Sequence, residues 1–131
     1  MVLEVTSGAI ATLREEAARA HPRECCGLLL GQGRRLVEVR ACANVHADPL
    51  AHFEIDPAAL IAAHRAARSG GLQLLGYYHS HPNGHLLPSA TDCDHATGDG
   101  AVWAIVAQDA VHWFRDAGIR FAELPTRLVD G

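Results

Sequence analysis

The sequence lacks the features that mark several large protein classes. It has no run of about 18 apolar residues, the length that a helix needs to cross a bilayer. Its beginning has no basic region followed by a long apolar stretch, so no secretory signal is indicated. The arginines are scattered and form no stripe, and the net charge of -4 argues against a nucleic-acid partner. We therefore expect a cytoplasmic protein that binds neither membranes nor nucleic acids.

Cysteine motifs are also missing. The four cysteines are Cys25, Cys26, Cys42 and Cys93, and no CxxC pair exists among them. This excludes a thiolate zinc knuckle and a thioredoxin-like redox pair, so we expect the cysteines to be buried small hydrophobic residues. The adjacent Cys25 and Cys26 suggest a thiol protease, but a reactive thiolate needs a lowered pKa and access to substrate. Because this run is otherwise apolar, thiol catalysis is disfavoured.

The length and the hydrophobic content of the chain are those of one globular domain. Its 131 residues, of which 49% are hydrophobic, suffice to bury roughly two-thirds of the unfolded surface in one core. We therefore expect residues 1–131 to form a single domain. Strands and helices alternate in the middle of the chain, whereas its end resembles an antiparallel meander. This combination predicts an α/β fold of the mixed α+β kind, with a mixed β-sheet flanked by helices on both faces.

Local signals place the expected elements. Short apolar or alternating runs, bounded by glycine and turn residues, predict strands at 2–5, 25–31, 34–44, 72–80, 101–107, 111–115 and 119–124. The strands at 25–31 and 34–44 should form a hairpin. Helices are expected at 7–20, with Ser7 as the N-cap, and at 89–98. A third helix should begin at Asp56 and Pro57 and end at the Ser69–Gly71 break.

A pair of histidines lies at the end of the strand predicted at 72–80. Because strand side chains alternate, His79 and His81 point the same way and can reach one ion. Pro82 stops the strand pairing, and Asp92 returns in the first turn of the next predicted helix. Two imidazoles and one carboxylate, with a fourth position left for water, are the composition of a catalytic zinc site. A structural site would supply four protein ligands instead.

The same residues also permit a structural interpretation. Ser89 and Asp92 fit an S-x-x-D capping box that begins a helix without any metal. From spacing alone, the zinc site and an exposed turn with a capping box are about equally favoured, and both can hold at Ser89. Nine histidines make coincidence easy, and seven of them carry no predicted function: His21, His46, His52, His64, His85, His95 and His112.

The stretch from 79 to 92 resembles the signature of a known family. HSHP, the six residues NGHLLP and SATD reproduce the pattern H-[ST]-H-P-x6-S-x-x-D of the JAMM family, the zinc metalloproteases of the JAB1/MPN/Mov34 fold. The segment RECCGLLLG is similar to the family's segment around an early glutamate, which corresponds to Glu24, and HFEIDPAALIAAHRAA is similar too. The likeness covers roughly residues 2–124 and resembles the short single-domain prokaryotic type.

The resemblance implies an active zinc metallopeptidase with the JAB1/MPN fold, whose architecture is similar to that of cytidine deaminases. It implies that His79, His81 and Asp92 hold one Zn²⁺ per chain, that Glu24 transfers the proton, and that Ser89 assists the oxyanion. The substrate implied is a ubiquitin-like or sulfur-carrier protein with a Gly-Gly tail. Cleavage after that tail breaks a peptide or isopeptide bond, or releases cysteine.

Three alternatives are weighed against this function. A zinc deaminase needs H-x-E and a later P-C-x-x-C, but His79 is followed by Ser80 and His81, and P-C-x-x-C is absent. A non-catalytic, zinc-stabilised interaction module is disfavoured by the intact metal and proton-transfer positions. A general deubiquitinase-like isopeptidase stays open, although the short connections leave little surface for a second ubiquitin. We expect a narrow groove that admits glycine because its backbone approaches the metal closely.

Overall fold

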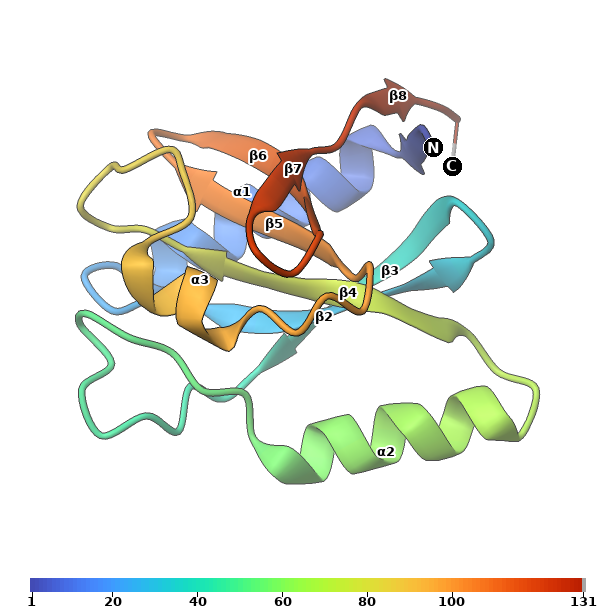
Figure 1. Ribbon diagram of the computed structural model, residues 1–131, viewed down its shortest axis with the longest axis horizontal. Coiled ribbons are helices and arrows are strands. Elements are labelled where there is room, and N and C mark those ends of the chain that lie inside the picture. Colours follow the sequence, from blue (N-terminus) through green and yellow to red (C-terminus); the bar gives the residue numbers. More distant parts are fainter. Residues whose placement is uncertain (131) are drawn as a thin grey trace.

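An eight-stranded mixed sheet organises residues 1–130, the part of the chain that the computed structural model describes (Figure 1). The elements are, in chain order, β1 (Leu3–Val5), α1 (Ser7–Ala20), β2 (Cys26–Gln32), β3 (Arg35–Cys42), α2 (Pro57–Arg68), β4 (Gln73–Ser80), α3 (Ala90–His95), β5 (Val102–Ala107), β6 (Ala110–Asp116), β7 (Phe121–Glu123) and β8 (Thr126–Leu128). Across the sheet the strands follow the order β7-β6-β5-β4-β2-β3-β1-β8.

The strand pairings confirm the predicted mixed sheet. β2 and β3 form the expected antiparallel hairpin, and β5, β6 and β7 form the antiparallel meander. β4 joins these two halves because it pairs antiparallel with β2 and parallel with β5. The chain reaches β5 from β4 by a crossover through α3, as a parallel pair requires. β4 therefore lies near the centre of the sheet.

Helices cover both faces of this sheet. Figure 1 shows α1 on one side of the sheet and α2 on the other. Leu13 of α1 packs in the same buried cluster as Leu29 and Tyr78, whereas Ala63 of α2 packs with Cys26 and Leu28. The central strands are buried on both faces, which explains why β2 and β5 read as continuous apolar runs in the sequence.

Helix ends follow the expected capping chemistry, with one correction. Asp56 accepts a hydrogen bond from the backbone N–H of Ala58 and Pro57 occupies the first turn of α2, as predicted. The N-cap of α1 is Thr6 and not Ser7: the Thr6 hydroxyl accepts a hydrogen bond from the backbone N–H of Ala9 at 3.0 Å. Either hydroxyl is a suitable cap, and the extended backbone at Thr6 decides between them.

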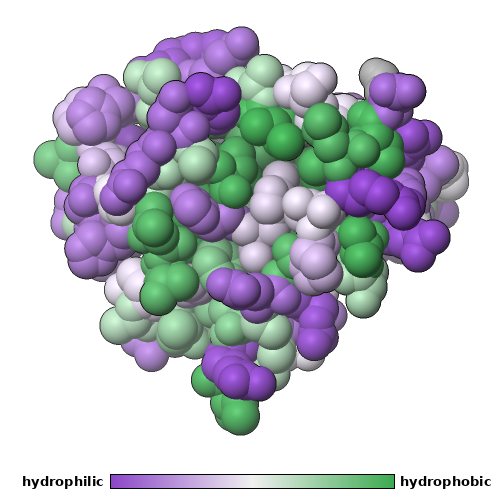
Figure 2. Space-filling model, turned by 90° about the horizontal axis from the view of Figure 1, so that it is seen from above, coloured by the Kyte–Doolittle hydropathy of each residue, from purple (hydrophilic) through white to green (hydrophobic). Residues whose placement is uncertain are grey.

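Two further expectations need correction. β8 (Thr126–Leu128) was not predicted, because all three of its side chains are exposed and it has no apolar alternation. The cysteines are not uniformly buried, since Cys93 is exposed and Cys42 is partly exposed. On the face of the molecule that Figure 2 shows, apolar and hydrophilic side chains are interspersed, as on a water-exposed surface. Among residues 1–130, no helix combines the length and apolarity needed to cross a membrane.

Candidate metal centre

The predicted metal ligands meet at one end of the sheet. His79 lies near the end of β4, His81 follows directly after it, and Asp92 lies in α3. At this end of the molecule the loop between β4 and α3 and the long loop before α2 both extend beyond the strands (Figure 1). The carboxyl end of β4 is therefore surrounded by loops that can shape a site.

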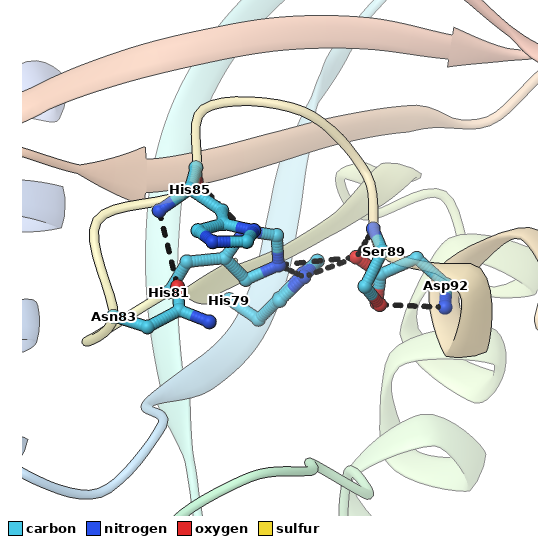
Figure 3. A network of polar contacts seen from close by, with 6 residues as sticks. All are labelled: His79, His81, Asn83, His85, Ser89 and Asp92. Carbon is cyan, nitrogen blue, oxygen red and sulfur yellow. Dashed lines mark hydrogen bonds and ion pairs between the residues drawn. The ribbon is translucent and has the colours of Figure 1, made fainter.

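Three donor atoms converge there (Figure 3). Nε2 of His79 lies 3.0 Å from Nε2 of His81, and each nitrogen lies 3.1 Å from Oδ2 of Asp92. Tetrahedral zinc with bonds of about 2.0–2.1 Å places neighbouring ligand atoms about 3.3–3.4 Å apart. A shift of a few tenths of an ångström thus converts this triangle into three corners of such a site. All three side chains are buried.

The hydrogen bonds of His81 and Asp92 orient both residues for metal binding. Nδ1 of His81 lies 2.9 Å from the carbonyl oxygen of His85, so Nδ1 carries the proton and Nε2 keeps its lone pair. Oδ2 of Asp92 accepts a hydrogen bond from the backbone N–H of Ser89 at 2.8 Å. The backbone N–H of Asp92 in turn donates to the Ser89 hydroxyl at 3.0 Å. The capping box and the donor triangle therefore coexist on Asp92.

His79 is enclosed by aromatic rings. Its ring stacks on Phe53 at a centroid distance of 4.3 Å, and Trp103 meets it edge-on at 5.7 Å. Burial lowers the pKa of His79, so the ring is neutral at pH 7, which is the form that binds a metal. Burial opposes ionisation of Asp92, but the close contacts of this carboxyl with the His79 and His81 rings, together with the hydrogen bond from the backbone N–H of Ser89, outweigh burial and lower its pKa.

Glu24 lies near the ligands, two residues before the neighbouring strand β2. Cys26 pairs with His79 in the β2–β4 ladder, so continuing this register by two residues places Glu24 opposite His81. The side chain is only 8% exposed. Burial raises the pKa of the Glu24 carboxyl from 4.5 to about 7; the charge of His81 opposes this rise, and the charges of Asp92 and Asp48 add to it. This carboxyl can therefore exchange a proton near neutral pH, which suits a general base.

A residue that sequence reasoning missed holds Glu24 in place. The Asn44 side chain donates hydrogen bonds to the carbonyl oxygens of Glu24 and His52 at 2.9 and 3.0 Å. Its Oδ1 accepts from the backbone N–H groups of His46 and Glu54, both at 3.1 Å. All four hydrogen-bonding positions of the amide are therefore used. A lone asparagine after a strand gave no signal in the sequence, because its partners become neighbours only in the fold.

Comparison with known proteins indicates the family of this chain. The family description "prokaryotic homologs of the JAB domain" matches residues 6–119. A desampylase from Haloferax volcanii is 38% identical over 98 residues, which cover 73% of this chain and 70% of the relative. A probable TtuB-protein conjugate cleaving protease from Thermus thermophilus is 41% identical over 96 residues, which cover 73% of this chain and 64% of the relative.

Solved structures share the whole architecture. A protein from Desulfitobacterium hafniense superposes with a TM-score of 0.87 at 26% identity, covering 99% of this chain and 94% of that one. A JAB1/MPN domain protein from Archaeoglobus fulgidus has a TM-score of 0.66 at 23% identity, covering 96% of this chain and 98% of that one, and shows the fold. The chain therefore belongs to the JAMM family of JAB1/MPN proteins, as a hydrolase of the prokaryotic JAB type.

Proposed function

We propose that this chain hydrolyses, with zinc, the bond that follows the C-terminal Gly-Gly of a ubiquitin-like or sulfur-carrier protein. The observation that carries the proposal is the donor triangle of His79, His81 and Asp92, with Glu24 near it, two residues before β2. The names of the relatives, a desampylase and a TtuB-protein conjugate cleaving protease, support the class of substrate. We place the reaction in the cytoplasm, with no nucleic acid or membrane among its partners.

The three ligands would hold one zinc ion per chain. Two neutral imidazoles and an ionised carboxylate match the preference of zinc for nitrogen and oxygen donors and leave a fourth position open. Zinc bound there supplies a Lewis acid that polarises the scissile carbonyl and makes water nucleophilic at neutral pH. The three ligands are buried, which in this proposal favours a substrate segment without side chains, because its backbone can approach them closely.

Glu24 and Ser89 supply the remaining chemistry in this proposal. Glu24 accepts a proton from the attacking water and donates it to the leaving nitrogen, because its pKa of about 7 permits both transfers. Ser89 accepts a hydrogen bond from the backbone N–H of Asp92, which leaves the hydrogen of its hydroxyl to donate. The side chain is exposed beside the donor triangle, where it can stabilise the developing oxyanion (Figure 3).

The substrate prediction is tested by three proteins at equal concentration. They are a ubiquitin-fold carrier ending in Gly-Gly-Cys, the same carrier with the first glycine changed to alanine, and diubiquitin. We expect the Gly-Gly-Cys carrier to lose its cysteine fastest, measured by mass spectrometry, and the alanine version to react at least about tenfold more slowly. A chelator should abolish the reaction and added Zn²⁺ should restore it.

Three results would contradict this proposal. Fastest cleavage of diubiquitin would favour a general deubiquitinase-like isopeptidase, because the site would then accept a second folded ubiquitin domain as readily as a short extension. Equal rates for the glycine and alanine carriers would show that close approach of the backbone does not limit the reaction. A zinc-loaded protein that cleaves none of the three would indicate a non-catalytic interaction module.

The thiol alternative is tested on the buried cysteines. Burial raises the pKa of Cys26 to about 12 and also raises that of Cys25, so neither forms a thiolate at neutral pH. Cys25→Ala and Cys26→Ala should therefore keep activity within a few-fold. Iodoacetamide sensitivity is measured in a Cys93→Ser background, because Cys93 is exposed and follows the ligand Asp92 directly. Inhibition in that background, together with an inactive Cys25 or Cys26 variant, would favour thiol catalysis.

A further inference from the structure

A side-chain-sized pocket adjoins the metal centre. Its volume is about 420 Å³, and it lies between the loop before α2, strands β4 and β5, and the segment after α3. Five of the residues that line it are aromatic or aliphatic: Phe53, Ile55, Leu60, Tyr77 and Trp103. The other six are polar: His46, Glu54, His95, Thr97, Asp99 and Asp116. Phe53 and Trp103 are also the two rings that contact His79. The pocket and the metal centre therefore share two wall residues, Phe53 and Trp103.

The charge on the pocket is acidic. Among the described residues that line it there is no arginine, and the chain as a whole contains no lysine. Glu54 and Asp99 are exposed on the rim. After burial, the charge of Asp99 is the second cause of the raised pKa of Tyr77, which places this carboxylate near the Tyr77 hydroxyl. A negative field thus lies at the mouth of this pocket.

A third carboxylate, that of Asp116, supports the wall of the pocket and does not contribute to the negative field at its mouth. Asp116 is 2% exposed and accepts hydrogen bonds from the backbone N–H groups of Thr97, Gly98 and Gly118, at 2.8 to 3.0 Å. These bonds tie the segment after α3 to the turn that follows β6. The outer wall of the pocket is therefore anchored, and Asp116 has few positions left for a ligand.

A second cleft lies on the other flank of the metal centre. It has a volume of about 550 Å³ and includes Ser80, His81 and Val106. Because strand side chains alternate, Ser80 and Val106 face the α1 side of the sheet, whereas Tyr77 and Trp103 face the opposite side. The two clefts therefore lie on opposite faces of the sheet near the end of β4.

The two parts of the proposed substrate, on either side of the scissile bond, differ in whether they carry side chains that can fill the pocket. The acyl half ends in Gly-Gly and has no side chains near the scissile bond, so a walled pocket adds nothing to its binding. The leaving half carries ordinary side chains. Resting on the proposed function, we infer that the pocket lined by Phe53, Tyr77 and Trp103 binds a lysine or arginine side chain of the leaving peptide or protein, close to the scissile nitrogen.

The physical match is specific to long basic side chains. Their methylene stems can lie along the apolar walls while the charged head reaches the rim at Glu54 and Asp99. A cation within about 6 Å of an aromatic face gains further attraction from the ring. A leucine fills the walls but leaves the rim unused, and a glutamate meets two like charges there. The expected order of preference is therefore basic, then apolar, then acidic.

The inference is tested with a ubiquitin-fold carrier whose Gly-Gly end is joined by a peptide bond to a four-alanine tail. Single Arg, Leu or Glu residues replace alanine at each of the first three tail positions. At the tail position whose side chain reaches the pocket, we expect kcat/KM of the Arg substrate to exceed that of the Glu substrate by about tenfold. This ratio should decrease at high salt. The double variant Glu54→Gln, Asp99→Asn should slow the Arg substrate and speed the Glu substrate. Asp94→Asn, an exposed carboxylate outside the pocket, should leave the ratio unchanged.

Binding without metal separates this inference from the proposed function. The chain has two tryptophans, so Trp113→Phe leaves Trp103 as the single indole emitter. In the metal-free protein, the amide of Ala-Arg-Ala should change that emission at a lower concentration than the amides of Ala-Leu-Ala or Ala-Glu-Ala. Cleavage of the four-alanine tail with no Arg preference at any position overturns the inference alone. Failure to cleave that tail while Ala-Arg-Ala still binds best overturns the proposed function alone.

Discussion

Replacing Glu24 by glutamine is expected to lower kcat by about 100-fold or more, with zinc content unchanged. Glutamine preserves the shape and the backbone hydrogen bonds of Glu24 but cannot accept the proton of the attacking water. In the wild type, kcat/KM should fall as pH drops through the pKa of Glu24, at or below about 7, because only the ionised carboxylate accepts a proton. Turnover is measured by release of the C-terminal extension from a Gly-Gly carrier. Wild-type turnover in this variant would exclude Glu24 as the base.

A stability measurement shows whether the Glu24→Gln variant is folded. In the wild type, folding raises the pKa of Glu24 from 4.5 to about 7, so between these pH values the folded protein binds more protons than the unfolded chain. The stability of the wild type is therefore lost as pH rises from about 4.5 to about 7. At pH 8 the metal-free Glu24→Gln protein should therefore be more stable than the wild type, by up to about 3 kcal/mol, and the gain should vanish near pH 4. Glu15→Gln, an exposed carboxylate on α1, serves as the control.

Removing both imidazoles is expected to abolish metal binding. The His79→Ala, His81→Ala variant keeps one of the three donors, and a single carboxylate holds zinc weakly. We expect less than about 0.1 zinc per chain by elemental analysis, against about one in the wild type, and no measurable hydrolysis. Zinc binding by the wild type should also weaken as pH falls below the histidine pKa, since ligating imidazoles must be neutral.

The matched control for this variant is His64→Ala. His64 is an exposed residue of α2 and takes no part in the donor triangle, so zinc content and activity should not change. Circular dichroism of all proteins checks that the sheet has formed. Unchanged zinc in the double variant would place the ligands elsewhere in the chain, and the assignment of His79, His81 and Asp92 would then be wrong.

The sequence predicted best the features that depend on local chemistry. Asp56 and Pro57 begin α2 as expected, because a cap and a first-turn proline act within one turn of helix. The common direction of His79 and His81 follows from strand alternation alone. The position of Glu24 could not be derived in this way, since it depends on the pairing of β2 with β4. Only the resemblance to a family indicated it.

Other features depend on contacts that no local pattern encodes. The ring of Phe53 reaches His79 because the loop before α2 folds over the sheet, and nothing in the spacing of these residues signals it. β8 has no apolar alternation and exists because it pairs with β1 at the edge of the sheet. Cys93 was expected to be buried like the other cysteines, but α3 is too short to bury more than one face, and Asp92 occupies it.

The way Asn44 closes the loop before α2 has a consequence for how such an enzyme can acquire new substrates. Asn44 and Ile55 form a β-bridge at the base of the loop, so the ends of the loop are already joined next to Glu24. Residues inserted after the exposed Leu50 would lengthen a loop whose ends stay joined, and would leave in place the hydrogen bond from the Glu24 backbone N–H to the Pro49 carbonyl oxygen. Each doubling of the loop length costs only about 0.6 kcal/mol. Recognition surfaces can therefore be added at this point by insertion, while Glu24, His79, His81 and Asp92 keep their geometry.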